Sequence, residues 1–143
     1  YAAGDALADS TTEPEPLVFA GMARMNGGTG AITKAMLQTD APAFDAGLRL
    51  HLWNAPPTAT NDNEALALAT ADAEHYQGYV DFGDPVIAGS ELAIAANVAI
   101  GGSGLSFACA EDDDSLYGLI EVLDVFTPDA EQEFVVSLTA VRD

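Results

Sequence analysis

Two segments near the C-terminal end of the chain are dominated by apolar residues, many of them β-branched or aromatic. They are residues 116–126 (LYGLIEVLDVF) and residues 133–142 (EFVVSLTAVR), with a Pro-containing break between them. Residues of these types favour the pleated surface of a β-sheet. Both segments are therefore predicted to be strands.

Shorter segments of the same kind recur along the chain, separated by Gly, Pro and Asn residues that favour turns. The further predicted strands are residues 17–25, 31–38, 48–53, 78–82, 90–100 and 105–110. The alanines of residues 90–100 also allow a helix. The alternation of Leu92, Ile94 and Ala96 favours a strand instead.

Helix is expected only within residues 60–77, as one or two short turns that Asn61 and Thr70 could cap. The whole pattern is about eight short strands with little helix. Such a pattern predicts an all-β protein with the architecture of a jelly-roll-like two-sheet β-sandwich.

The length of 143 residues suits a single domain, but the opening of the chain differs in composition from the rest. Residues 9–16 are polar and include two prolines, which favour an extended backbone over a packed element. We therefore predict an extended N-terminal arm over residues 1–16 and a single β-sandwich domain over residues 17–143. The first five residues lack the basic start and apolar core of a secretory signal, so no leader is expected there.

The charge of the chain is strongly one-sided. Four basic residues face 23 acidic ones, for a formal net charge of −19, and no Lys or Arg occurs between Arg49 and Arg142. Binding a phosphate backbone or an anionic lipid surface requires clustered cations, so we expect neither a nucleic-acid nor a membrane partner. The charge can serve solubility alone, or it can also form an outward-facing surface that keeps large particles apart.

Residues suited to catalysis or metal binding are few. His51 and His75 have no neighbour at ligand spacing, and Cys109 stands alone on an alternating segment without a nearby cation. Structural or surface roles are predicted for the two histidines, and a buried structural role is predicted for the thiol. The Gly-rich residues 27–30 and 101–104 lack the Lys-Ser/Thr of a phosphate-binding loop, so both are predicted to be hairpin turns. We expect no enzyme activity, no cofactor and no bound metal.

One acidic run leaves two interpretations open. Residues 111–114 are Glu-Asp-Asp-Asp, and four successive carboxylates would gain from a hard cation such as Ca²⁺. Alternate side chains of an extended segment point apart, however, and the Gly-punctuated spacing of a calcium loop is missing. A solvated turn is the preferred interpretation. For residues 61–64, helix capping is preferred over ion binding in the same way.

A series of short motifs runs through nearly the whole chain. They are YAAGD at residues 1–5, LVF at 17–19, Ala23-Arg24, NGGTGAIT at 26–33, LHLWNAPPT at 50–58, NDN at 61–63, LYGLI at 116–120 and residues 134–141. This arrangement resembles that of the capsid cement, or decoration, proteins encoded beside the major capsid gene of tailed phages. The motifs are turn and strand signatures rather than catalytic ones, and the chain is more acidic than typical members.

The resemblance implies a jelly-roll-like protein that forms a dimer or another symmetric oligomer. It implies a place on the exterior of the capsid, where the protein bridges subunits of the major capsid protein lattice. Alternative functions are another virion component, such as a head-fibre base or a tail-tip carbohydrate-binding β-sandwich, and a secreted adhesion module. The missing signal and the lone cysteine argue against the adhesion module.

A flexible arm suits a cement protein because it can become ordered on a neighbouring subunit and add contacts to a multivalent attachment. The alternative is simple fraying of a terminus. The residues predicted to bind the partner are Thr11, Thr12, Glu13, Pro14, Glu15 and Pro16.

Overall fold

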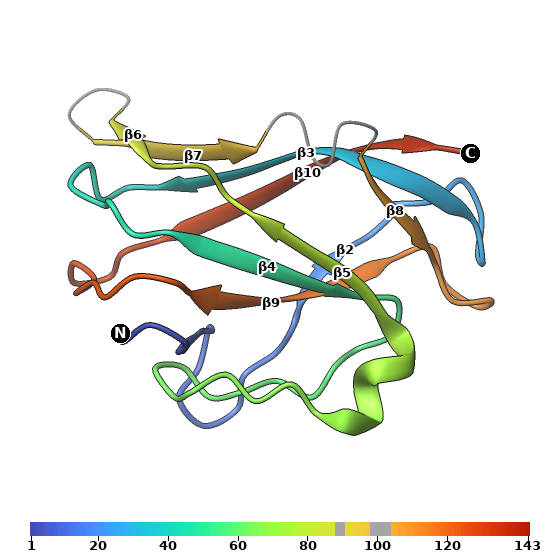
Figure 1. The fold of residues 1–143 in the computed structure, drawn as a ribbon, viewed down its shortest axis with the longest axis horizontal. Coiled ribbons are helices and arrows are strands. Elements are labelled where there is room, and N and C mark those ends of the chain that lie inside the picture. Colours follow the sequence, from blue (N-terminus) through green and yellow to red (C-terminus); the bar gives the residue numbers. More distant parts are fainter. Residues whose placement is uncertain (88–90, 98–103) are drawn as a thin grey trace.

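The computed structural model describes residues 1–87, 91–97 and 104–143. They form two five-stranded sheets that face each other, and every strand pairing is antiparallel (Figure 1). This confirms the predicted all-β, two-sheet architecture. Within the described ranges no helix is long and apolar enough to cross a membrane.

The first sheet has the order β1–β9–β4–β5, and β2 also pairs with β9. Its strands are β1 (Ala6–Leu7), β2 (Leu17–Phe19), β4 (Leu48–Trp53), β5 (Tyr76–Asp81) and β9 (Leu116–Val122). β4 and β9 pair along the whole length of β4, so they form the centre of this sheet. The short strands β1 and β2 occupy successive parts of the other side of β9.

The second sheet has the order β10–β3–β7–β6, and β8 also pairs with β3. Its strands are β3 (Thr29–Thr39), β6 (Val86–Ile87), β7 (Ala93–Asn97), β8 (Leu105–Ala108) and β10 (Phe134–Arg142). β3 is central, with β10 along one side and β7 and β8 in succession along the other. β10 therefore lies at the edge of the sheet.

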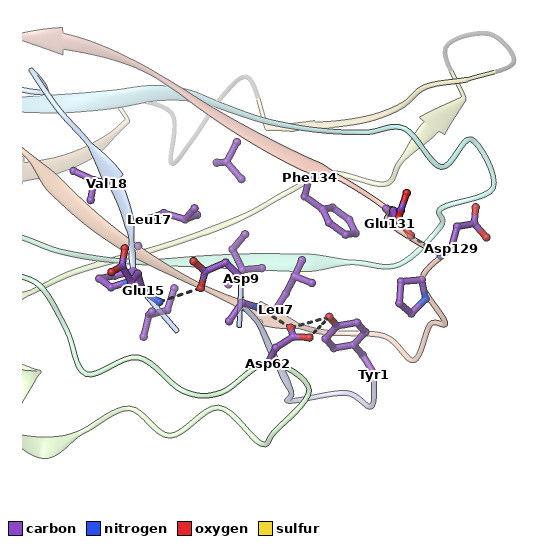
Figure 2. Close-up of a pocket in the computed structure, with 18 residues that line it drawn as sticks. Tyr1, Leu7, Asp9, Glu15, Leu17, Val18, Asp62, Asp129, Glu131 and Phe134 are labelled. Carbon is purple, nitrogen blue, oxygen red and sulfur yellow. Dashed lines mark hydrogen bonds between the residues drawn. The ribbon is translucent and has the colours of Figure 1, made fainter. Parts of the chain in front are cut away.

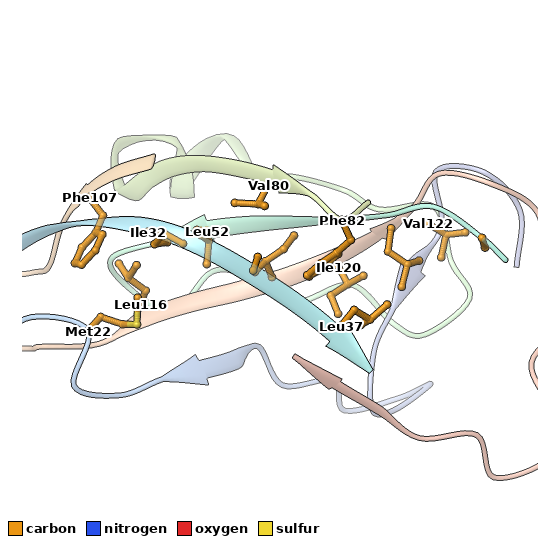
Figure 3. Packing of buried hydrophobic residues seen from close by; sticks show 14 of the residues in the cluster. Met22, Ile32, Leu37, Leu52, Val80, Phe82, Phe107, Leu116, Ile120 and Val122 are labelled. Atoms are coloured by element: carbon orange, nitrogen blue, oxygen red, sulfur yellow. The ribbon is translucent and has the colours of Figure 1, made fainter. Parts of the chain in front are cut away.

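The core fills the space between the two sheets (Figure 3). Leu50 and Leu52 of β4 and Ile32 of β3 have no exposed surface at all. On β4, His51 and Trp53 point away from this core but are buried too, because the ring of Tyr76 packs against both of them. Burial on both faces explains why the apolar alternation of β4 is imperfect in the sequence.

The predicted hairpin at residues 27–30 is wrong. β2 and β3, which flank it, belong to different sheets, so this segment carries the chain from one layer to the other. The backbone N–H of Gly27 donates to the carbonyl oxygens of Ala110 and Asp113, and this packs the turn against a distant loop. The turn signal was local, whereas the pairing partners of the flanking strands were set by long-range contacts.

The predicted helix also forms only in part. Thr70–His75 make a short 3-10 helix, η1, without a side-chain cap, and residues 64–69 are not helical. The carbonyl of Glu64 instead accepts from the N–H of Ala6, and the N–H of Leu66 donates to the carbonyl of Gly4. These backbone groups are used in pairing with the start of the chain, so they are not free for a helix.

The predicted strand at residues 90–100 is confirmed over Ala93–Asn97, as β7, whereas Glu91 and Leu92 precede the strand. Residues 90 and 98–100 lie outside the described residues. So do residues 101–103, and with them most of the second predicted Gly-rich turn.

The opening residues lie on the sandwich itself. Ala6 and Leu7 form β1 against β9, and the ring of Tyr1 stacks on Phe126 with 4.9 Å between centroids. The phenol of Tyr1 donates to Asp62 at 2.7 Å. The boundary predicted at residue 16 therefore follows a segment that contributes to the first sheet.

Candidate functional site

His51 occupies the centre of a polar cluster on the outer face of the first sheet. Its Nδ1 lies 2.9 Å from the hydroxyl of Tyr76, and its Nε2 lies 2.8 Å from a carboxylate oxygen of Glu121. Arg49 forms two hydrogen bonds with Asp81, of 2.6 and 3.1 Å. The cluster joins three neighbouring strands, β5, β4 and β9, through their outward side chains.

A hydroxyl, an imidazole and a carboxylate that are hydrogen-bonded in this order can also activate the hydroxyl as a nucleophile in an enzyme. Here burial raises the pKa of Tyr76, so the phenolate that such a mechanism needs is disfavoured. His51 itself is 5% exposed and both of its ring nitrogens are engaged. The arrangement is therefore best explained as a set of hydrogen bonds that holds β5, β4 and β9 together, with His51 in a structural role.

The other candidate residues do not join this cluster. Nδ1 of His75 lies 3.0 Å from the amide oxygen of Asn54. Cys109 is buried in the core, and burial raises its thiol pKa, which keeps the sulfur unreactive. Over the parts of the chain that the structure describes, no three His, Cys, Asp or Glu side chains gather as a metal site would require.

Two carboxylates of the acidic run at residues 111–114, those of Asp113 and Asp114, bond to separate partners. Asp113 accepts hydrogen bonds from the hydroxyl of Tyr117 at 2.6 Å and from the N–H of Ser115 at 3.0 Å. Asp114 accepts from the N–H of Gly21 at 3.2 Å. These carboxylates organise the loop through hydrogen bonds within the chain.

Asp113→Asn should reveal a pH-dependent contribution to stability. The hydrogen bonds from Tyr117 and Ser115 lower the pKa of Asp113 below its usual value. Such a carboxylate stabilises the fold above its unfolded pKa of about 3.9, and this stabilisation is lost as the pH falls through the lower folded pKa. The difference in unfolding free energy between wild type and Asp113→Asn should therefore be constant near neutral pH and shrink below about pH 4.

Urea unfolding at a series of pH values measures this difference. Tyr117→Phe removes the donor that lowers the pKa of Asp113 most. The unfolding free energy of this variant should therefore depend less on pH than that of the wild type. A difference between wild type and Asp113→Asn that does not change with pH would contradict the assignment.

A groove of about 630 Å³ opens between the two sheets, beside the edge strand β10 (Figure 2). Phe134 and Val136 of β10 line one wall, and Leu17 and Val18 of β2 line another. Leu7 of β1 also contributes to the apolar lining. Val18 is 61% exposed, so part of this apolar surface is in contact with water.

Carboxylates surround the apolar walls. Asp9, Glu15, Asp129 and Glu131 line the groove and are exposed, whereas Asp62 already accepts hydrogen bonds from its own chain. Neither Lys nor Arg is among the described residues that line the groove. An apolar floor with a negative rim suits a ligand that is itself apolar and cationic.

The structure brings two of the six predicted partner-binding residues to this groove. Glu15 and Pro16 line it, whereas the other four do not. The wall formed by β10 was missed, although residues 133–142 were predicted to be a strand. The sequence carried no local signal for this wall, because Phe134 and Val136 alternate with exposed residues as the inward side chains of any half-buried strand do.

The fold and the groove define the chain as an antiparallel β-sandwich with an open, acidic-rimmed edge. Comparison with models of known protein families, with curated proteins and with solved structures finds no match to the chain.

Proposed function

We propose that this protein is a structural virion component that binds the outer surface of a phage capsid and stabilises it by bridging major capsid protein subunits. The observation that carries the proposal is the groove beside β10, which offers an apolar surface for another protein at the open edge of the sandwich. The resemblance to capsid cement proteins supplies the identity of that other protein.

The charge of the chain agrees with this role. A net charge of −19 repels nucleic acid and anionic membranes, so it leaves protein surfaces as the natural partners. On the exterior of a particle, carboxylates left in water would also oppose clustering of particles. Modest affinity at each site is sufficient, because attachment at many symmetry-related sites multiplies its effect. Assembly into a dimer or another symmetric oligomer belongs to the same proposal.

Residues 11–16 support a secondary contact. Thr11, Thr12, Glu13 and Glu15 are exposed, and Pro14 and Pro16 are half-buried, so the segment presents an accessible surface next to the groove. Within this proposal the segment contacts a neighbouring subunit of the shell.

The test compares filled capsids with and without this protein. Particles that lack it should burst at a temperature several degrees lower, as followed by release of DNA to a fluorescent dye. Adding back the purified protein should restore the original temperature, whereas an unrelated acidic protein of similar size should not. Particles of equal robustness that do not rebind the protein would refute the proposal, and binding to glycans instead would favour a tail-tip or fibre role.

A further inference from the structure

The edge of β10 next to the groove is open. β10 pairs with β3 along one side, from Phe134 opposite Thr39 to Arg142 opposite Gly30. Among the described residues no strand pairs with its other side. An open edge presents unpaired backbone N–H and C=O groups to any extended chain that approaches it.

This edge lacks the features that usually prevent strand addition. Such features are prolines, inward-pointing charges, bulges and short length. Residues 134–141 contain no proline and no charged residue. The one irregularity in the pairing with β3 falls between Thr139 and Ala140, which leaves residues 134–139 regular.

A strand added to this edge would place every second side chain in the groove. Successive side chains on one face of a strand are about 6.6 Å apart, so six residues would direct three of them towards the walls. Those walls are Phe134 and Val136 on one side and Leu17 and Val18 on the other. The volume of about 630 Å³ falls within the roughly 300–1,000 Å³ of typical binding pockets, so apolar side chains would fit.

The charges at the rim select the occupant. Figure 2 shows Glu15 towards one end of the groove and Asp129 and Glu131 at the other. A second copy of this chain carries the same excess of carboxylates, and its approach would bring like charges together. A segment with Lys or Arg on both sides of its apolar residues would instead be attracted at both ends.

We propose that the groove binds an extended protein segment, cationic at both ends and apolar between, as an added strand on the open edge of β10. The backbone of residues 134–139 provides the hydrogen bonds, and the walls at Phe134, Val136, Leu17 and Val18 select apolar side chains. That this segment belongs to a capsid protein rests on the proposed function. The mode of binding, by strand addition in the groove, does not depend on it.

The test uses a synthetic peptide of sequence KKVTVTVKK with a fluorescent label. Fluorescence anisotropy at low ionic strength should show binding to the wild-type protein, weakening as salt is added. The peptide EEVTVTVEE should bind at least about tenfold more weakly because its ends meet the same carboxylates. Hydrogen exchange should show slower exchange of amides in residues 134–139 when KKVTVTVKK is present.

Two double variants distinguish the effect of the carboxylates at the rim on binding from the effect of the net charge of the protein. Asp129→Lys with Glu131→Lys should weaken binding about tenfold. Asp84→Lys with Glu111→Lys changes the net charge equally at exposed positions outside the groove and should have little effect. Circular dichroism of each variant confirms that the sandwich is folded.

A peptide methylated on the backbone nitrogens of its central residues keeps the side chains and loses the donors. Equal binding of this peptide would overturn strand addition. Sedimentation that shows a dimer displaced by KKVTVTVKK would overturn the cationic segment as the occupant, because a second copy of the chain would then fill the groove. Rebinding of the same variants to capsids distinguishes the two proposals. If the protein binds the peptide but not capsids, the capsid role is refuted and strand addition in the groove stands. If Asp129→Lys with Glu131→Lys leaves capsid binding unchanged, the groove is not the surface that binds the capsid.

Discussion

Replacing Leu50 with alanine should lower the free energy of unfolding by about 2–5 kcal/mol. Leu50 has no exposed surface and lies on the central strand of the first sheet, opposite Ile120 on one side and Val80 on the other. Truncation removes apolar atoms from the core and leaves a cavity. Because β4 is hydrogen-bonded to a strand on each side, the surrounding structure cannot collapse fully to fill this cavity. Urea or thermal unfolding followed by circular dichroism measures the loss.

Two further variants show whether burial causes this loss. Leu50→Met nearly conserves volume and should cost less than about 1.5 kcal/mol. Val125→Ala removes apolar atoms from a side chain that is 76% exposed, and should change stability by no more than about 0.5 kcal/mol. A cost for Leu50→Ala that did not exceed the cost for Val125→Ala would show that the core is not packed as described.

Gly30→Ala should destabilise the second sheet by about 1–3 kcal/mol through overpacking. A Cβ atom at residue 30 would lie 2.6 Å from the carbonyl oxygen of Val141 and 2.7 Å from Cζ of Phe107. The oxygen belongs to the backbone of β10 and the ring is buried in the core, so neither can move cheaply. The added methyl would push β10 or β8 away from β3.

Gly47→Ala is the matched control. A Cβ there would meet a carboxylate oxygen of Asp124 at 2.8 Å. That oxygen is on a side chain, and rotating it away gives up a single hydrogen bond from the N–H of Gly47, of 3.0 Å. The expected cost is about 1 kcal/mol, and a larger cost at residue 47 than at residue 30 would contradict the tight contact between β3 and β10.

Much of the secondary structure was predictable, because strand patterns are local. Residues 48–53 were predicted as a strand and form β4 with the same bounds, and residues 133–142 differ from β10 by one residue. Prediction failed where distant segments compete for the same backbone groups. Residues 64–69 contain good helix formers, yet the carbonyl of Glu64 and the N–H of Leu66 bond with residues 4–6.

The candidate site was predictable only in small part. The polar segment at residues 11–16 drew attention to Glu15 and Pro16, which do line the groove. The opposite wall comes from β10, more than a hundred residues later in the chain, and nothing local to Phe134 or Val136 indicates that they face β2. The two walls meet only because both sheets end on the same side of the sandwich.

The sequence by itself determined the all-β class, the position of most strands and the strongly negative charge, since each of these follows from the order or number of residues within short windows. Only the tertiary structure decided that β10 lies at an edge and that an apolar groove opens beside it. The physical reason is that strand pairing is a contact between distant segments. Backbone hydrogen bonds satisfy the same groups in any register, so the partner of each strand is selected by the packing of the whole core.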